Sequence, residues 1–132
     1  MTKTASSFRL DAASGVPVYR QIMDQVTGAI ASGMLSPGTQ LPTVRQVSVD
    51  LAVNPNTVLR AYRELEIRGI LDTQQGTGTF VAERPTPADS SERARRLEQL
   101  ITDFAARAGD GGFSLKELID GLNQRLPDNR RK

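Results

Sequence analysis

Apolar residues recur at helical spacing in the first quarter of the chain. The stripe follows Pro17, which suits the first position of a helix, and it ends near Gly33. Its members are Tyr19, Ile22, Val26, Ala29 and Ile30. The pattern predicts one amphipathic helix between Pro17 and Gly33, followed by a turn at residues 36–38.

Two more helical stripes follow, and each has its own start signal. Thr43 is the predicted N-cap of a short second helix, because Gln46 three residues later completes a capping box. A tight corner then leads to a third helix, with Asn54 as N-cap and Pro55 at the first position. This third helix is predicted to stop at Gly69.

Beyond Gly69 the period changes to that of short strands. Residues 70–75 and 79–82 are predicted strands, and a glycine-bearing loop at residues 76–78 joins them as a hairpin. Residues 40–42 supply a short extended piece, because Pro42 disfavours helix before it. Helix, helix, corner, helix and hairpin is the order of a winged helix-turn-helix, predicted here for residues 8–83.

The last third of the chain predicts a linker at 84–91, a helical unit at 92–126 and a flexible tail at 127–132. The first helix is predicted to break between Ala108 and Gly112, and Ser114 with Glu117 caps the second. Their apolar faces carry Leu97, Leu100, Ile101, Phe104, Leu115, Leu118, Ile119 and Leu122. The fold class is mainly α with a small β-hairpin (α+β).

The apolar faces of this short helical unit need a covering surface, because about forty residues bury little core alone. They can pack on the first helix of the same chain or against the same unit of a second chain. A two-fold homodimer is favoured, since two-fold dimers are the commonest assemblies.

Composition narrows the chemistry of the 132-residue chain. It has no cysteine and no histidine, which removes disulfides, thiolate sites and the commonest metal ligand and general base. We expect no metal, no cofactor and no enzymatic activity, since carboxylates such as Asp50, Glu64 and Asp72 form no convincing pair. No apolar run is long enough to span a membrane, so we expect a cytoplasmic protein.

Net charge is only +2, so a basic surface requires local segregation of charge.

The third helix provides that segregation. At 100° per residue, one face carries Val58, Ala61, Tyr62 and Leu65, and the opposite face carries Asn56, Arg60 and Arg63 with Thr57 on its flank. In a winged helix-turn-helix this helix enters the DNA major groove, where Asn suits adenine and Arg suits guanine. The predicted DNA contacts are Thr43, Arg45, Asn54, Asn56, Thr57, Arg60, Arg63, Gln75, Gly76, Thr77 and Gly78.

Each of these residues also has a purely structural interpretation. Asn54 can serve only as an N-cap. Arg60 can form an i,i+4 ion pair with Glu64, and Glu64 can do so with Arg68. Arg45 is assigned mainly to phosphate, with guanine contact left open. The hairpin loop is preferred over a nucleotide-phosphate loop, because no helix follows Gly78.

Residues 32–45 (SGMLSPGTQLPTVR), the NPNTV run at 54–58, and residues 76–81 (GTGTFV) resemble the GntR-type bacterial transcription regulators, over roughly residues 8–83. Much of that family has Ser-Arg where this chain has Asn54-Pro55, so that arginine contact is not carried over. The resemblance implies DNA contacts for Arg45, Asn56, Thr57 and residues 76–78. The role of Arg60 rests on the helical wheel, since the usual family arginine aligns near Leu59.

Asn-Pro-Asn-Thr and the short C-terminal segment are similar to the YtrA-type subgroup of these regulators. That resemblance implies dimerisation through the C-terminal helices and repression of transporter operons. The leading hypothesis is therefore a dimeric, sequence-specific repressor of double-stranded DNA operators. A small-molecule effector of unidentified class is a further candidate partner, bound in the dimer groove. The alternative is a winged-helix protein-interaction module that does not bind DNA, which the low net charge favours.

Overall fold

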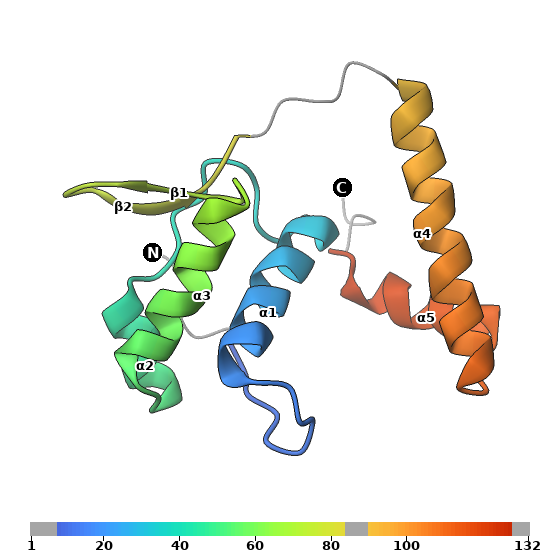
Figure 1. The fold of residues 1–132 in the computed structure, drawn as a ribbon, viewed down its shortest axis with the longest axis horizontal. Helices are drawn as coiled ribbons and strands as arrows, with labels where there is room; N and C mark the ends of the chain where they lie inside the picture. Colours follow the sequence, from blue (N-terminus) through green and yellow to red (C-terminus); the bar gives the residue numbers. More distant parts are fainter. Residues whose placement is uncertain (1–7, 84–89, 128–132) are drawn as a thin grey trace. The chain divides into compact units, whose positions relative to one another are not determined.

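The computed structural model describes residues 8–83 and 90–127, which form two separate compact units (Figure 1). Residues 84–89 of the predicted linker (84–91) and residues 128–132 of the predicted tail (127–132) lie outside the described residues. No helix within the two described ranges is long and apolar enough to cross a membrane.

The first two helices of the first unit begin and end close to the predicted positions. Helix α1 spans Val18–Ser32, so Pro17 is its N-cap rather than its first residue, and Gly33 closes it with a φ of 88°. Helix α2 spans Val44–Leu51. Its capping box is confirmed, because Thr43 Oγ1 accepts from the Gln46 backbone N–H at 3.1 Å and Gln46 Oε1 accepts from the Thr43 N–H at 2.9 Å.

The corner before helix α3 is as tight as predicted. Ala52 adopts left-handed φ and ψ values of 57° and 46°, which turn the chain immediately after α2. Helix α3 spans Pro55–Ile67, and Asn54 Oδ1 caps it by accepting from the Asn56 backbone N–H at 2.7 Å. The N-cap and Pro55 predictions are confirmed, while the helix ends two residues before Gly69.

An antiparallel hairpin completes the first unit. Strand β1 (Leu71–Gln74) pairs with strand β2 (Gly78–Val81) in a register that puts Gln74 opposite Gly78. Gly78 therefore belongs to the strand and not to the loop, which corrects the predicted boundary. The extended piece is confirmed, since Gln40 bridges to Phe80 and the Leu41 N–H donates to the Thr79 carbonyl at 2.8 Å.

One apolar core holds these elements together. The predicted buried face of α3 is confirmed, with Val58, Ala61, Tyr62 and Leu65 at most 3% exposed. Buried residues from the other elements complete it: Ile22, Met23, Val26, Leu35, Leu41, Val47, Leu71 and Val81. The Tyr62 hydroxyl donates to the Pro42 carbonyl at 2.7 Å. Burial of the phenol in the core raises the pKa of Tyr62 well above its ordinary range.

The second unit is a pair of helices, α4 (Ser90–Asp110) and α5 (Leu115–Arg125). Helix α4 starts two residues inside the predicted linker and ends at Asp110, within the predicted break between Ala108 and Gly112. Ala108 is buried where the chain turns back, and its carbonyl accepts from the Phe113 N–H at 2.8 Å. The second predicted capping box is confirmed, because Ser114 Oγ accepts from the Glu117 N–H at 3.1 Å.

Substituting Tyr62→Phe tests how the buried hydroxyl contributes to stability. At neutral pH we expect a loss of about 1–3 kcal/mol in unfolding free energy, because the Pro42 carbonyl loses its donor. The unfolded phenol has an ordinary pKa of 10.0, and the folded pKa lies above it. As pH rises above 10.0 the unfolded chain binds fewer protons than the folded one, so the wild type loses stability there.

The variant lacks this ionisation, so its stability should fall less steeply in the alkaline range. Urea unfolding at a series of pH values measures both slopes. If the unfolding free energies of wild type and variant fell equally steeply with pH above 10.0, ionisation of Tyr62 would not be the cause of the alkaline loss of stability.

Candidate nucleic-acid interface

The polar N-terminal end of α3 is open on the surface of the first unit. Asn54 and Asn56 are exposed and Thr57 is half-buried. The first backbone N–H groups are already engaged, since Asn54 Oδ1 accepts from Asn56 and the Asn54 carbonyl accepts from the Thr57 N–H at 2.9 Å. The structural role of Asn54 as a cap is thus observed. The Asn56 side chain remains outside that cap and faces the surface.

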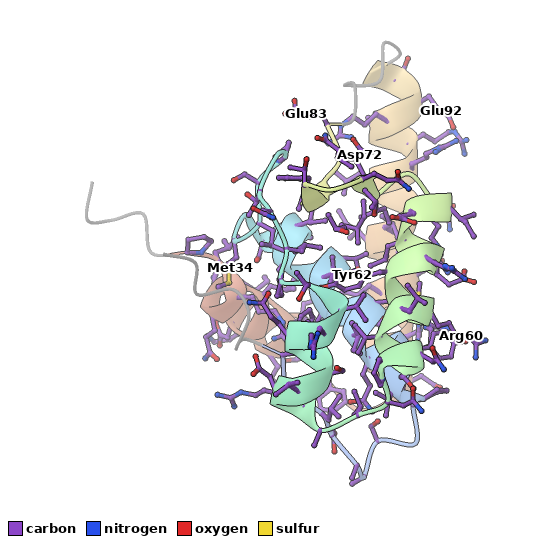
Figure 2. The ribbon with its side chains drawn as sticks, turned by 90° about the vertical axis from the view of Figure 1, so that its left-hand side faces the viewer. Met34, Arg60, Tyr62, Asp72, Glu83 and Glu92 are labelled. Carbon is purple, nitrogen blue, oxygen red and sulfur yellow. The ribbon has the colours of Figure 1, made fainter. Side chains whose placement is uncertain are left out.

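Three exposed arginines lie on helices α2 and α3. Arg45 near the start of α2, and Arg60 and Arg63 on α3, are all exposed. Figure 2 shows Arg60 on the outer side of α3 and Tyr62 pointing to the interior. Helix α3 is thus amphipathic in the predicted orientation, with its cationic side chains opposite the core.

The two i,i+4 ion pairs that the sequence allows on α3 do not form. Within residues 8–83, neither Arg60 with Glu64 nor Glu64 with Arg68 makes a salt bridge. The Arg60 guanidinium instead lies over the ring of Tyr19 in α1, with Cζ 3.8 Å from the ring centroid. This distance is well inside the range of a cation–π contact.

Thr43 lies at the start of α2, close in sequence to Arg45. It is exposed, and its hydroxyl oxygen is the acceptor of the capping box. The structure therefore gives Thr43 a defined local role at the N-terminus of the helix. Its predicted DNA contact stays a prediction.

The hairpin tip is braced by a residue that the sequence did not single out. Gln75, Gly76 and Thr77 are exposed, and the Thr77 carbonyl accepts from Gln40 Nε2 at 3.2 Å. Gly78 has a φ of 140°, and a Cβ on it would lie only 2.4 Å from Gln40 Nε2. The positive φ favours glycine here, and a side chain at this position would also push the end of the Gln40 amide away from Thr77.

A second link joins the hairpin to α3. The Thr73 hydroxyl of β1 donates to a carboxylate oxygen of Glu66, and it lies 3.1 Å from the Thr79 hydroxyl of β2. The hairpin is thus tied to α3 on one side and to the Gln40 segment on the other.

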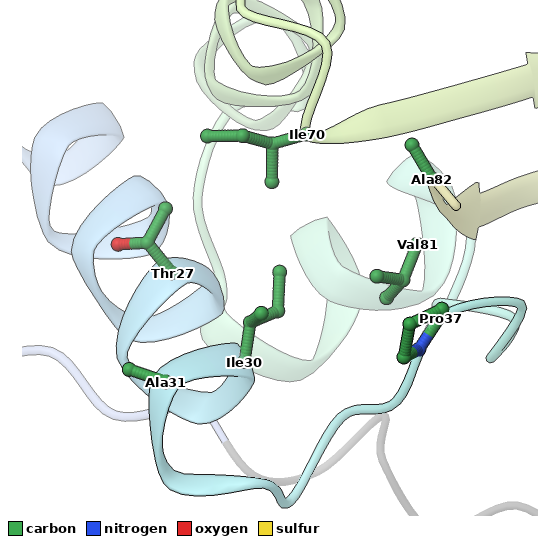
Figure 3. Close-up of a pocket in the computed structure, with 7 residues that line it drawn as sticks. All are labelled: Thr27, Ile30, Ala31, Pro37, Ile70, Val81 and Ala82. Carbon is green, nitrogen blue, oxygen red and sulfur yellow. The ribbon is translucent and has the colours of Figure 1, made fainter. Parts of the chain in front are cut away.

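A shallow apolar hollow of about 300 Å³ lies in the same unit (Figure 3). Its lining residues come from α1, the following turn and the ends of the hairpin: Thr27, Ile30, Ala31, Pro37, Ile70, Val81 and Ala82. The Thr27 hydroxyl donates to the Met23 carbonyl at 3.1 Å, so its hydrogen is already engaged. The hollow offers mainly apolar contact.

Comparison with known proteins places this arrangement in a family. The model of the bacterial regulatory proteins of the gntR family matches residues 18–81, which contain α1 to β2. The HTH-type transcriptional regulator YhcF of Bacillus subtilis is 34% identical over 109 residues, covering 83% of this chain and 89% of YhcF. The chain belongs to the GntR family.

The similarity extends to the YtrA-like branch of the GntR family. The HTH-type transcriptional repressor YtrA of Bacillus subtilis is 30% identical, over 88% of this chain and 89% of YtrA. The solved structure of YtrA from Sulfolobus acidocaldarius, a GntR-family transcription factor, superimposes with a TM-score of 0.58 at 31% identity, covering 76% of this chain and 97% of that one.

A DNA complex of another GntR-type domain also resembles the first unit. The DNA-binding domain of AraR, solved with an operator, has a TM-score of 0.50 at 29% identity and covers 56% of this chain and 92% of that one. The winged helix-turn-helix predicted from the sequence is therefore confirmed as the fold of this unit.

Substituting Gly78→Ala tests the brace at the hairpin. We expect it to lower the unfolding free energy by about 1–3 kcal/mol, because φ is strained and the Gln40 amide is displaced from Thr77. Gly76→Ala is the matched control, since Gly76 also has a positive φ of 78° but open space around it. Thermal unfolding measures both variants.

The Gly78 variant should lose more stability than the Gly76 variant, and the gap should shrink in a Gln40→Ala background. Equal losses in the wild-type background would show that Gln40 does not constrain Gly78.

Proposed function

We propose that this DNA-binding regulator acts as a homodimer that recognises a specific operator in double-stranded DNA and represses transcription there. One observation carries the proposal: Asn56, Arg60 and Arg63 are exposed on the face of α3 that lies opposite its buried stripe. That face belongs to the helix that reads the major groove in helix-turn-helix proteins.

The residue types divide naturally between bases and backbone. Asn56 and Arg60, one helical turn apart, suit adenine and guanine edges respectively. Arg45, at the start of α2, is placed against a phosphate, because the helix before the recognition helix crosses the DNA backbone. The exposed hairpin tip, Gln75 to Thr77, is assigned to the backbone or minor groove beside the recognition helix.

The assignment to repression draws on relatives. The Bacillus subtilis relative YtrA is named a repressor, and the AraR domain was solved with an operator. We extend both properties to this chain. The YtrA-type resemblance adds a transporter operon as the candidate regulated unit. The proposal places the regulator in the cytoplasm and gives it no catalytic role, metal or cofactor.

Dimerisation is proposed through the second unit, which leaves a large apolar face uncovered. Helix α5 contains no buried residue, and the exposed fractions on the two helices include 66% for Leu100, 47% for Phe104 and 56% for Ile119. The other members are Leu97, Ile101, Leu115 and Leu122, with Leu118 half-buried. Contiguous apolar surface of this kind is typical of an interface.

A two-fold dimer would present two α3 helices to half-sites about 34 Å apart, one turn of DNA. The operator would then be an inverted repeat, because the symmetry of the DNA site mirrors that of the protein. A small-molecule effector, if the regulator has one, is placed in the groove between the paired helices.

The alternative function, a winged-helix module that contacts proteins and not DNA, rests on the net charge of +2. The two functions differ in salt dependence. A DNA-binding regulator releases counterions and weakens as salt rises, whereas the alternative predicts no salt-sensitive mobility shift with the promoter DNA of its own gene.

Substituting Arg45→Ala should weaken binding to that promoter DNA and make the slope of log K against log salt shallower by about one unit. Fluorescence anisotropy over a salt series measures the slope. Arg68→Ala is the control, because it removes the same charge roughly 18 Å further along α3 than Asn56. A slope unchanged by the Arg45 substitution would refute the phosphate contact.

Substituting Phe104→Asp should convert the dimer to a monomer, because it places a charge in the centre of the apolar face of α4. Sedimentation equilibrium of the full chain measures the mass. Ala106→Asp is the matched control, since Ala106 is exposed on the opposite side of the same helix turn. A wild-type chain that sediments as a monomer would exclude the dimer and favour packing of this face within one chain.

A further inference from the structure

The contact between Arg60 and Tyr19 joins two helices that are far apart in sequence. Tyr19 is in the first turn of α1, and Arg60 is on the exposed face of α3. Their 3.8 Å separation, from guanidinium carbon to ring centroid, places the cation over the ring, within the range of a cation–π contact. Tyr19 itself is half-buried and packs against the core.

Stacking uses the face of the guanidinium and leaves its edge available. The N–H donors of arginine lie in the plane of the group, so a ring beneath that plane does not occupy them. Within residues 8–83, Arg60 forms no salt bridge, although Glu64 lies one turn away. The arginine thus rests on an aromatic ring, and its charge is not neutralised by an ion pair within residues 8–83.

The ring itself sits on a rigid base. The side chain of Gln21, in the same turn of α1, accepts from the Asp11 N–H at 2.8 Å and donates to the Val16 carbonyl at 2.9 Å. These bonds tie the preceding segment to the first turn of the helix. Ile22, the next core residue of α1, is fully buried. Tyr19 lies in this anchored turn and packs against the core, so the ring is supported on the side away from Arg60 by its own helix and the core.

We infer that Tyr19 is a positioning residue for sequence recognition, which holds the Arg60 guanidinium ready to meet a guanine edge. An arginine that is already oriented loses less conformational freedom when it binds a base. The inference rests on the proposed function. It adds that selectivity among DNA sequences depends on a residue of α1, outside the helix-turn-helix pair.

The test compares specific with nonspecific binding of the full chain. The specific probe is a duplex that the wild-type chain selects from a random-sequence library, and the nonspecific probe is a scrambled duplex of the same composition. For each variant, the ratio of the two dissociation constants reports selectivity. Thermal unfolding of each variant confirms that it folds.

Tyr19→Leu should lower selectivity about three- to five-fold, the range expected from losing an exposed cation–π contact. Tyr19→Phe keeps the ring and should retain selectivity within about two-fold, because the phenol hydroxyl is not needed for the stack. Arg60→Ala should weaken specific binding more than nonspecific binding. In that Arg60→Ala background, Tyr19→Leu should have no further effect on selectivity.

Three results would overturn the inference. Equal loss on both probes would make Tyr19 a general binding or folding residue. A full effect of Tyr19→Leu in the Arg60→Ala background would mean that it acts by another route. Tighter specific binding by Tyr19→Leu would mean that the stack holds Arg60 away from DNA. Failure of the wild type to select any duplex would instead refute the proposed function.

Discussion

The burial of one stripe of α3 is the constraint on which the rest of the first unit depends. Val58, Ala61, Tyr62 and Leu65 are at most 3% exposed, and burying each large apolar side chain contributes about 1.5–3 kcal/mol. Because successive residues on a helix differ by 100°, this stripe also determines where every other side chain of α3 points. The orientation of Asn56 and the other outward residues is therefore a consequence of the hydrophobic core.

The neighbouring elements take their positions from the same helix. The Tyr62 hydroxyl binds the Pro42 carbonyl just before α2, and Glu66 binds Thr73 in the hairpin. The segment before α2 is thus attached to the buried side of α3, and the hairpin is attached to its C-terminal half. Arg45 near the start of α2 and the hairpin are therefore carried by the same packed unit that orients the outward face of α3.

Sequence reasoning succeeded where structure depends on residues a few positions apart. The capping box joins Thr43 to Gln46, three positions along, and the cap at Asn54 joins it to Asn56, two positions along, so the local residue types are sufficient evidence. It was wrong about the start of strand β2, because the pairing of Gly78 with Gln74 is decided between two strands and not by the local run of glycines. It also missed Gln40, whose partner Thr77 is 37 residues away in the chain.

The partner of Arg60 was beyond local reasoning for the same reason, and its identity matters. Glu64, the neighbour on the helix, would have neutralised the arginine, whereas Tyr19 orients it without cancelling its charge. With a net charge of only +2, the chain has little excess positive charge with which to attract a polyanion such as DNA. An aromatic support for an arginine therefore suits a protein in which the placement of positive charge, and not its amount, must produce selectivity.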